Sequence, residues 1–202
     1  MAWAPGSVTP RALFDRRTAP IDDLARHAED VARSCHAMAV RFHRGGKLVV
    51  FGNGESSTDA QHVAVEFVHP VIVGKRALPA ISLTSDVATL TAVGLDEAFA
   101  HQIRFLAEPA DIALALSVDG HCPNVLRGLA QARALDMLTV ALVGGDGGRI
   151  AREHAAEHVL VARSDDPRVV KEVHVTAYHI LWELVHVFLE HPGALGTGAV
   201  RP

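Results

Sequence analysis

The sequence has few cysteines and aromatic residues, and it has no long apolar run. Only Cys35 and Cys122 occur, and neither lies in a Cys-X-X-Cys motif, which excludes a disulfide framework. The longest apolar runs, such as Ile112–Leu116 and Leu138–Val143, are far shorter than the roughly 20 residues that span a bilayer. The N-terminus also lacks the basic region and apolar stretch of a secretory signal, so we expect a cytoplasmic protein.

Neither sign of charge dominates the chain. The 19 Lys and Arg residues against 23 Asp and Glu residues give a formal net charge of −4, and the isoelectric point is about 6.3. This balance cannot create the positive field that attracts nucleic acid or an anionic membrane, so we expect direct binding to neither. The 202 residues are enough for one domain with a full core.

Short apolar runs alternate with longer amphipathic stretches along most of the chain. The runs are nearly continuous in apolar residues, as in parallel strands that are covered on both faces. The predicted strands are Lys47–Phe51, Ala80–Leu83, Ile112–Ser117, Leu138–Val143 and His158–Val161. The predicted helices are Ile21–Arg44, Ser57–Val68, Val87–Val93, Glu97–Leu106, Pro123–Leu135, Gly147–Glu153 and Pro167–Leu189. This order predicts a doubly wound α/β fold.

The two ends of the chain differ from its middle. Residues 1–19 combine prolines with arginines, and residues 191–202 are rich in glycine and proline. We therefore predict a flexible N-terminal tail over residues 1–19, one domain over residues 20–190, and a flexible C-terminal tail over residues 191–202.

A glycine-rich loop, residues 52–59, directly follows the first predicted strand. In an open parallel sheet, ligands bind beyond the carboxyl ends of the strands, where loops lead into helices. Gly52 and Gly54 let the backbone turn tightly and point N–H groups at a ligand, beside the positive end of the next helix. An ordinary strand-to-helix turn, with Ser56 and Asp59 as a capping pair, would explain the same residues.

A second loop, residues 117–124, follows the third predicted strand. Pro123 suits the first turn of a helix, which makes Cys122 the predicted N-cap. Cysteine is a poorer cap than serine, threonine or aspartate, so this position indicates either sequence drift or a special role.

Two helical segments carry polar side chains at spacings that suit chemistry. His62 and Glu66 are four residues apart, so they share a helix face and can converge on a proton or a metal. A surface His–Glu pair is the alternative. The last predicted helix contains Lys171, His174 and His179 among apolar residues, and each buried polar group needs a partner. A core histidine with satisfied hydrogen bonds would explain either histidine alone.

Taken together, these pieces resemble the SIS (sugar isomerase) domain family, and most closely the phosphoheptose isomerases. The likeness covers about residues 20–190 and rests on five segments in the family's order. These segments are Gly52–Phe67, Leu78–Phe99, Ser117–Val125, Val143–Gly148 and Lys171–Leu184. The resemblance implies a three-layer αβα domain with a five-stranded parallel sheet and long N- and C-terminal helices.

The resemblance also implies a reaction, the isomerisation of a sugar phosphate between aldose and ketose through an enediol. Phosphoheptose isomerases carry out this reaction on sedoheptulose 7-phosphate, as homotetramers with sites between subunits. A carboxylate must move a carbon-bound proton while an acid serves the oxygens, and by resemblance Glu66 is the base and His179 the acid. The family's zinc would be held by His62, Glu66, His179 and a glutamine. Lys171 stands where that glutamine is expected, and an ammonium has no lone pair to offer a metal.

The spacing of Lys171 and His179 bears on assembly. Eight residues on one helix separate them by about 80° around the axis and roughly 12 Å along it. If both side chains serve one small site, subunits must assemble that site, which favours an oligomer.

By the same resemblance, the substrate is bound mainly by loop residues. The predicted substrate-binding residues are Asn53, Gly54, Glu55, Ser56, Asp96, Ser117, Asp119, Gly120, Cys122 and Lys171. Two of these loops depart from the family pattern: Glu55 replaces a glycine, and Asp119 and Cys122 replace hydroxyl residues that surround the phosphate. Asp119 thereby brings an anion toward the place of a dianion, which is unfavourable unless a proton or a cation intervenes.

Three functions remain open from the sequence. The first is an isomerase with an altered substrate, whose charge Lys171 holds. The second is a catalytically silent SIS-domain protein that acts by binding a ligand or a protein, as the DnaA initiator-associating protein of this family does. In the third, Glu55, Asp119, His121 and Cys122 gather a cation, because such side chains suit metals.

Overall fold

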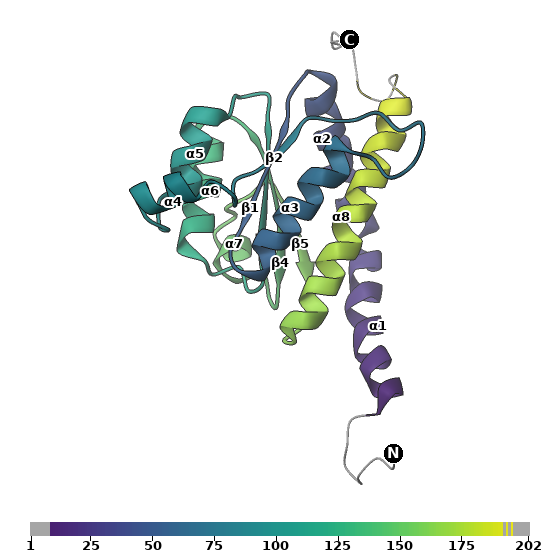
Figure 1. Ribbon diagram of the computed structural model, residues 1–202. Helices are drawn as coiled ribbons and strands as arrows, with labels where there is room; N and C mark the ends of the chain where they lie inside the picture. Colours follow the sequence, from purple (N-terminus) through teal and green to yellow (C-terminus); the bar gives the residue numbers. More distant parts are fainter. Residues whose placement is uncertain (1–8, 192, 194, 196–202) are drawn as a thin grey trace.

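The computed structural model describes residues 9–191, 193 and 195, and its centre is a parallel sheet of five strands (Figure 1). The strands are β1 (Leu48–Gly52), β2 (Ala80–Ser82), β3 (Ile112–Ser117), β4 (Leu138–Gly144) and β5 (His158–Ala162). Their order across the sheet is β2-β1-β3-β4-β5, and every neighbouring pair is parallel. All residues of β1, β3 and β4 are buried, which explains why the sequence shows these strands as continuous apolar runs.

Helices cover both faces of the sheet. They are α1 (Pro10–Arg26), α2 (Ala28–His43), α3 (Glu55–Val68), α4 (Val87–Val93), α5 (Ala98–Leu106), α6 (Pro123–Ala134), α7 (Gly148–Arg152) and α8 (Pro167–Glu190). Figure 1 shows α2, α3 and α8 on one side of the sheet and α5, α6 and α7 on the other. Each side has its own buried apolar cluster, so the predicted three-layer α/β architecture is confirmed. None of the helices in the described part of the chain is both long and apolar enough to cross a membrane.

The N-terminal part of the chain corrects the predicted tail. Residues 1–8 lie outside the described residues, but α1 begins at Pro10, with the Thr9 hydroxyl accepting a hydrogen bond from the Ala12 N–H at 3.2 Å. Proline is favoured at the first helical position, where no N–H is needed. Arg17 fixes the helix against α8, because its guanidinium donates to both carboxylate oxygens of Glu172 at 2.5 and 2.9 Å. The prediction of a flexible tail is therefore wrong for residues 10–19.

The long first helix predicted over Ile21–Arg44 is interrupted at His27, which ends α1 and precedes α2. Its ring Nδ1–H donates to the carbonyl oxygen of Asp23 at 2.8 Å, and its backbone leaves the helical region at φ −100° and ψ 26°. The side chain thus competes with the backbone for a helical carbonyl. At the other end, α8 stops at Glu190, one residue beyond the predicted Leu189. Of the predicted C-terminal tail, Leu195 is buried against the core, and residues 192, 194 and 196–202 lie outside the described residues.

The strand order places a switch point between β1 and β3. From β1 the chain continues through α3 to β2 on one side, whereas from β3 it continues through α6 to β4 on the other. At such a point the loops diverge and leave a crevice at the carboxyl edge of the sheet. The loops that meet there are residues 52–59 and 117–124, the two that the sequence singles out.

Candidate active site

Three side chains with metal- and proton-binding atoms converge on the face of the sheet covered by α3 and α8. His62 and Glu66 come from α3 and His179 from α8, and their ligand atoms all lie within 4.8 Å of one another. His62 Nε2 is 3.2 Å from Glu66 Oε1, and the rings of His62 and His179 are 5.3 Å apart. The Glu66 side chain is only 13% exposed, so this is not merely a surface His–Glu pair. Within the described residues, no other group of three histidine, cysteine or acidic side chains is as close.

Contacts between α3 and α8 hold this group in place. The Tyr178 hydroxyl hydrogen-bonds His62 Nδ1 at 2.8 Å, and the Trp182 indole N–H donates to the backbone carbonyl of Glu66 at 2.9 Å. Tyr178 is 1% exposed. Burial, with added repulsion from the Asp59 and Glu66 carboxylates, raises the pKa of the Tyr178 phenol well above its usual value. Its hydroxyl therefore stays protonated.

Lys171, on α8, contacts α3 at Asp59, about one turn before His62. Its ammonium donates to the Asp59 carboxylate at 2.7 Å, to the Glu55 carbonyl at 3.2 Å and to the Thr58 hydroxyl at 3.3 Å. Lys171 and His179 thus contact different turns of α3 within one chain, and Lys171 offers no ligand atom to the three-donor group. The alternative of a capping pair is wrong, because Gly54 is the N-cap of α3 and Asp59 pairs with Lys171 instead.

The loop of residues 52–59, here called the first ligand loop, is tied to the start of α6 by two asparagines. The loop of residues 117–124 is the second ligand loop. Asn53 and Asn124 exchange side-chain amide hydrogen bonds of 2.7 and 2.9 Å, and Asn124 also donates to the Leu95 carbonyl at 3.2 Å. Gly54 and Glu55 are exposed at this edge of the sheet, as a ligand loop requires.

Two of the predicted substrate-binding residues, Ser56 and Asp96, make contacts within the protein. Ser56 is buried, and its N–H donates to the Asn53 carbonyl at 2.9 Å, so it is not among the exposed groups at the sheet edge. Asp96 is exposed and forms an ion pair with Arg127 at 3.4 Å, on the side of the sheet opposite α3 and α8.

The second ligand loop is folded on its own side chains. The Ser117 hydroxyl accepts from the Gly120 N–H at 3.0 Å, and the Asp119 carboxylate accepts from the His121 N–H at 2.9 Å. Two N–H groups that a phosphate would use are therefore already bonded. Cys122 is the N-cap of α6, as predicted, without a side-chain capping hydrogen bond.

The proposed cation site is not formed among the described residues. Its donors would be Glu55, Asp119, His121 and Cys122, yet no three of these side chains bring their ligand atoms within 4.8 Å of one another. The Cys122 sulfur instead accepts a hydrogen bond of 3.7 Å from the Ser117 hydroxyl. This interpretation of the loop substitutions is therefore wrong.

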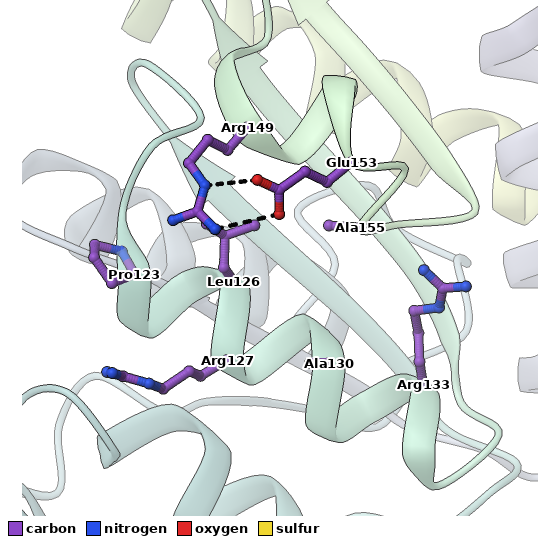
Figure 2. A pocket seen from close by; sticks show the side chains of 8 residues that line it. All are labelled: Pro123, Leu126, Arg127, Ala130, Arg133, Arg149, Glu153 and Ala155. Carbon is purple, nitrogen blue, oxygen red and sulfur yellow. Dashed lines mark hydrogen bonds and ion pairs between the residues drawn. The ribbon is translucent and has the colours of Figure 1, made fainter.

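A groove of about 410 Å³ between α6 and α7 is lined by three arginines but carries little free charge (Figure 2). Figure 2 shows the Arg149 guanidinium bonded to Glu153, at 2.7 and 3.3 Å. Arg133 donates to the His154 carbonyl at 2.7 Å, and Arg127 is shared between two acidic residues at 3.4 and 3.5 Å. The groove also lies on the opposite side of the sheet from the three-donor group. We therefore place the candidate active site at α3 and α8.

Comparisons with known proteins agree with this fold and site. A family model described as "SIS domain" matches residues 14–144. The chain belongs to the SIS domain family. Phosphoheptose isomerases from Solidesulfovibrio magneticus and Chlorobaculum parvum are both 40% identical to it, over 167 and 185 residues. These matches cover 81% and 88% of this chain and 80% and 87% of the relatives.

Solved structures of SIS proteins give the same result. The phosphoheptose isomerase from Francisella tularensis has a TM-score of 0.81 and 30% identity, covering 88% of this chain and 96% of that one. The enzyme from Neisseria gonorrhoeae has a TM-score of 0.79 and 27% identity, covering 87% and 95%. The resemblance found from the sequence motifs is therefore confirmed.

Three residues that matter for the site were not predicted from the SIS motifs. Asp59 holds Lys171, Asn124 joins the two loops, and Tyr178 contacts the ring of His62. Asp59 and Asn124 lie within the motif segments Gly52–Phe67 and Ser117–Val125, so their positions in the sequence could have indicated a role in the site. Tyr178 is the only tyrosine of the chain and directly precedes His179. This position next to a predicted catalytic residue could have indicated that Tyr178 contacts the site.

Proposed function

We propose that this SIS-domain protein isomerises a phosphorylated sugar between its aldose and ketose forms, with the reacting carbons at His62, Glu66 and His179. The observation that carries the proposal is the convergence of these three donor groups within 4.8 Å. The similarity to proteins named phosphoheptose isomerase supports the same reaction class.

In this proposal Glu66 moves the proton between carbons. Its carboxylate takes the proton from the carbon next to the carbonyl, which leaves an enediol, and returns it to the neighbouring carbon. His179 transfers the hydroxyl proton to the carbonyl oxygen, so the product is an isomer and no other reactant is needed. The shelter of Glu66, whose side chain is 13% exposed, suits this role, because water competes less for the proton of a carboxylate that is largely removed from solvent.

The phosphate end of the substrate would lie toward the start of α3. Gly54 and His62 are separated by about 12 Å along the helix axis, so a ligand that reaches both must be several carbon atoms long. Lys171 supplies the cation nearest this path, and the helix N-terminus adds a favourable dipole. Asp59 already neutralises Lys171, and Asp119 adds a negative charge to the second loop. Both carboxylates lower the net positive charge that this end of the site offers to a phosphate.

Zinc is part of the proposal, and the donor set suits it. Two imidazoles and one carboxylate are a common ligand set for catalytic zinc, with a further position left for water or substrate. His62, Glu66 and His179 would hold the ion, which when bound polarises the substrate's carbonyl. Lys171 cannot be a fourth ligand, because its ammonium has no lone pair and is held by Asp59.

We also propose a cytoplasmic homotetramer. Exposed apolar side chains adjoin the candidate site on the second half of α3 and the segment after it. They are Val65, Val68, Val71, Ile72 and Val73. A contiguous apolar surface of this kind marks an interface more often than a solvated face. Light scattering coupled to size-exclusion chromatography measures the subunit number directly.

Glu66→Gln tests the catalytic proposal. Turnover of sedoheptulose 7-phosphate, followed by NMR with and without added zinc, should be abolished in this variant, while the fold and subunit number stay unchanged. Glu183→Gln is the matched control, because Glu183 lies exposed on α8 and should keep full turnover.

Two results would contradict the catalytic proposal. Full activity of Glu66→Gln would remove the role assigned to Glu66. Absence of turnover by the well-folded wild-type protein would instead favour the catalytically silent binding function.

A further inference from the structure

The ring of His62 is held at both nitrogens, by two different partners. Nδ1 is 2.8 Å from the Tyr178 hydroxyl and Nε2 is 3.2 Å from Glu66 Oε1. Tyr178 is almost fully buried, and its hydroxyl makes no other hydrogen bond within the described residues. The placement of every proton in this chain of three groups is therefore constrained.

Only one arrangement of protons satisfies all three groups without a metal. An ionised Glu66 carboxylate can only accept, so the proton of the neutral imidazole must lie on Nε2. Nδ1 of His62 then has a free lone pair and accepts the hydroxyl proton of Tyr178. Every proton has an acceptor, and the ring is fixed in the Nε2–H tautomer.

A metal ion shared with Glu66 and His179 requires the opposite tautomer. The ion takes the lone pair of His62 Nε2, so the imidazole proton moves to Nδ1. Nδ1–H can donate to the Tyr178 oxygen, but the hydroxyl proton of Tyr178 then has no acceptor within the described residues. A buried polar group without a partner is unfavourable.

We infer that Tyr178 is a positioning residue that, together with Glu66, holds His62 in the Nε2–H tautomer and thereby weakens zinc binding by His62, Glu66 and His179. The inference rests on the proposed function only in taking these three residues as the reactive site. Lys171 acts in the same direction, since it stands where the family resemblance places a fourth zinc ligand. Two features of this chain therefore lower its zinc affinity.

Tyr178→Phe tests the inference, because it removes the hydroxyl and keeps the ring. Histidine-labelled protein is examined free of metal by ¹H–¹⁵N NMR, with the His62 signals assigned from His62→Gln. We expect the Nε2–H tautomer alone in the wild type and a detectable Nδ1–H fraction in Tyr178→Phe, where only Glu66 still favours the Nε2–H form. Competition with a chelator should show zinc binding to Tyr178→Phe that is roughly tenfold tighter, as expected when the unbonded hydroxyl proton is eliminated.

Trp182→Phe is the matched control. It also removes a hydrogen bond from α8 to α3, to the Glu66 carbonyl, but leaves both ring nitrogens of His62 in contact with their partners. It should change neither the tautomer nor the zinc affinity, although it lowers the melting temperature as Tyr178→Phe does.

Three results would overturn the inference: an Nδ1–H tautomer in the wild type, zinc binding to Tyr178→Phe no tighter than to the wild type, or an equal shift in Trp182→Phe. Both readouts are independent of turnover. An inactive wild-type protein would therefore refute the proposed function without deciding this inference.

Discussion

The ammonium of Lys171 on α8 lies 2.7 Å from the Asp59 carboxylate on α3, and Asp59 is almost completely shielded from solvent. The pair connects the N-terminal part of α8 to the N-terminal part of α3, next to Gly54 and Glu55 of the glycine-rich loop. Its two members differ in exposure, at 33% for the Lys171 side chain and 7% for that of Asp59. The lysine can therefore be reached by a ligand, whereas the aspartate cannot.

Removal of Lys171 should destabilise the fold. Lys171→Met leaves the Asp59 carboxylate buried without a cation, and we expect a loss of about 2 kcal/mol in the free energy of unfolding measured in urea. Arg11→Met is the control, because its pair with Asp15 is exposed and should contribute less than about 0.5 kcal/mol. Adding Asp59→Asn to Lys171→Met should restore most of the loss. Equal effects of Lys171→Met and Arg11→Met would contradict this interpretation.

Stability should depend on pH through His174. This residue is 2% exposed, its ring hydrogen-bonds the backbone of Val143, and Nε2 has no partner within the described residues. Burial lowers the pKa of His174 to about 4 from a usual 6.5. Between these values the unfolded chain binds a proton that the folded chain does not, so the free energy of unfolding falls as the pH drops from 6.5 toward 4.

His174→Gln measures this contribution. The variant lacks the titrating ring, so between pH 7 and pH 5 it should lose about 2 kcal/mol less than the wild type in urea unfolding. His121→Gln serves as the control and should keep the wild-type pH dependence, because His121 is exposed on the second ligand loop. The same pH slope in His174→Gln and the wild type would show that the imidazole is protonated equally in both states.

Two loop glycines, Gly120 before α6 and Gly145 between β4 and α7, should respond very differently to alanine. Gly120 and Gly145 both have positive φ, at +70° and +63°. A Cβ at Gly120 would lie 2.1 Å from the Gly147 carbonyl oxygen, whereas one at Gly145 meets nothing within 4 Å. Gly145→Ala should cost about 1 kcal/mol from backbone strain alone, and Gly120→Ala more than about 3 kcal/mol in the free energy of unfolding. Equal losses of stability for Gly120→Ala and Gly145→Ala would mean that the loop of Gly120 is not packed against Gly147.

The amide pair of Asn53 and Asn124 should be energetically coupled. A double-mutant cycle with Asn53→Ala and Asn124→Ala in urea should give a coupling of about 1–2 kcal/mol. Asn124→Ala should be the more harmful single variant, since Asn124 also bonds the backbone of Leu95 and Val125. Additive effects would show that the two loops are held independently.

The parallel core of the fold could be predicted from the sequence because buried strands impose continuous apolar runs. The bounds of β3 and α4 agree with the prediction at both ends. The part of α1 before Ile21 was missed because its prolines and arginines resemble a tail, and only Pro20 and Leu24 in the whole helix are buried. Its stability depends on tertiary contacts, among them the one from Arg17 to Glu172, 155 residues away.

The candidate site could be predicted only in part. The four-residue spacing of His62 and Glu66 is visible in the sequence, and His179 follows from the family resemblance. The partners of these residues could not be found in the same way, because Tyr178 lies 116 residues from His62 and Lys171 lies 112 from Asp59. Such pairs depend on how α8 packs on α3, which no local pattern determines.

The three donor side chains project from the middle of two packed helices, whereas the residues that would recognise the rest of a ligand lie on loops at the sheet edge. The positions of helical residues are fixed by the buried core, and a loop residue can be replaced without moving them. Under the proposed function, loop residues such as Glu55 and Asp119 would therefore change which substrate is recognised and leave the three donor side chains in place. A lineage built on this scaffold can exchange one substrate for another by small steps, each of which leaves the proton-moving groups where they were.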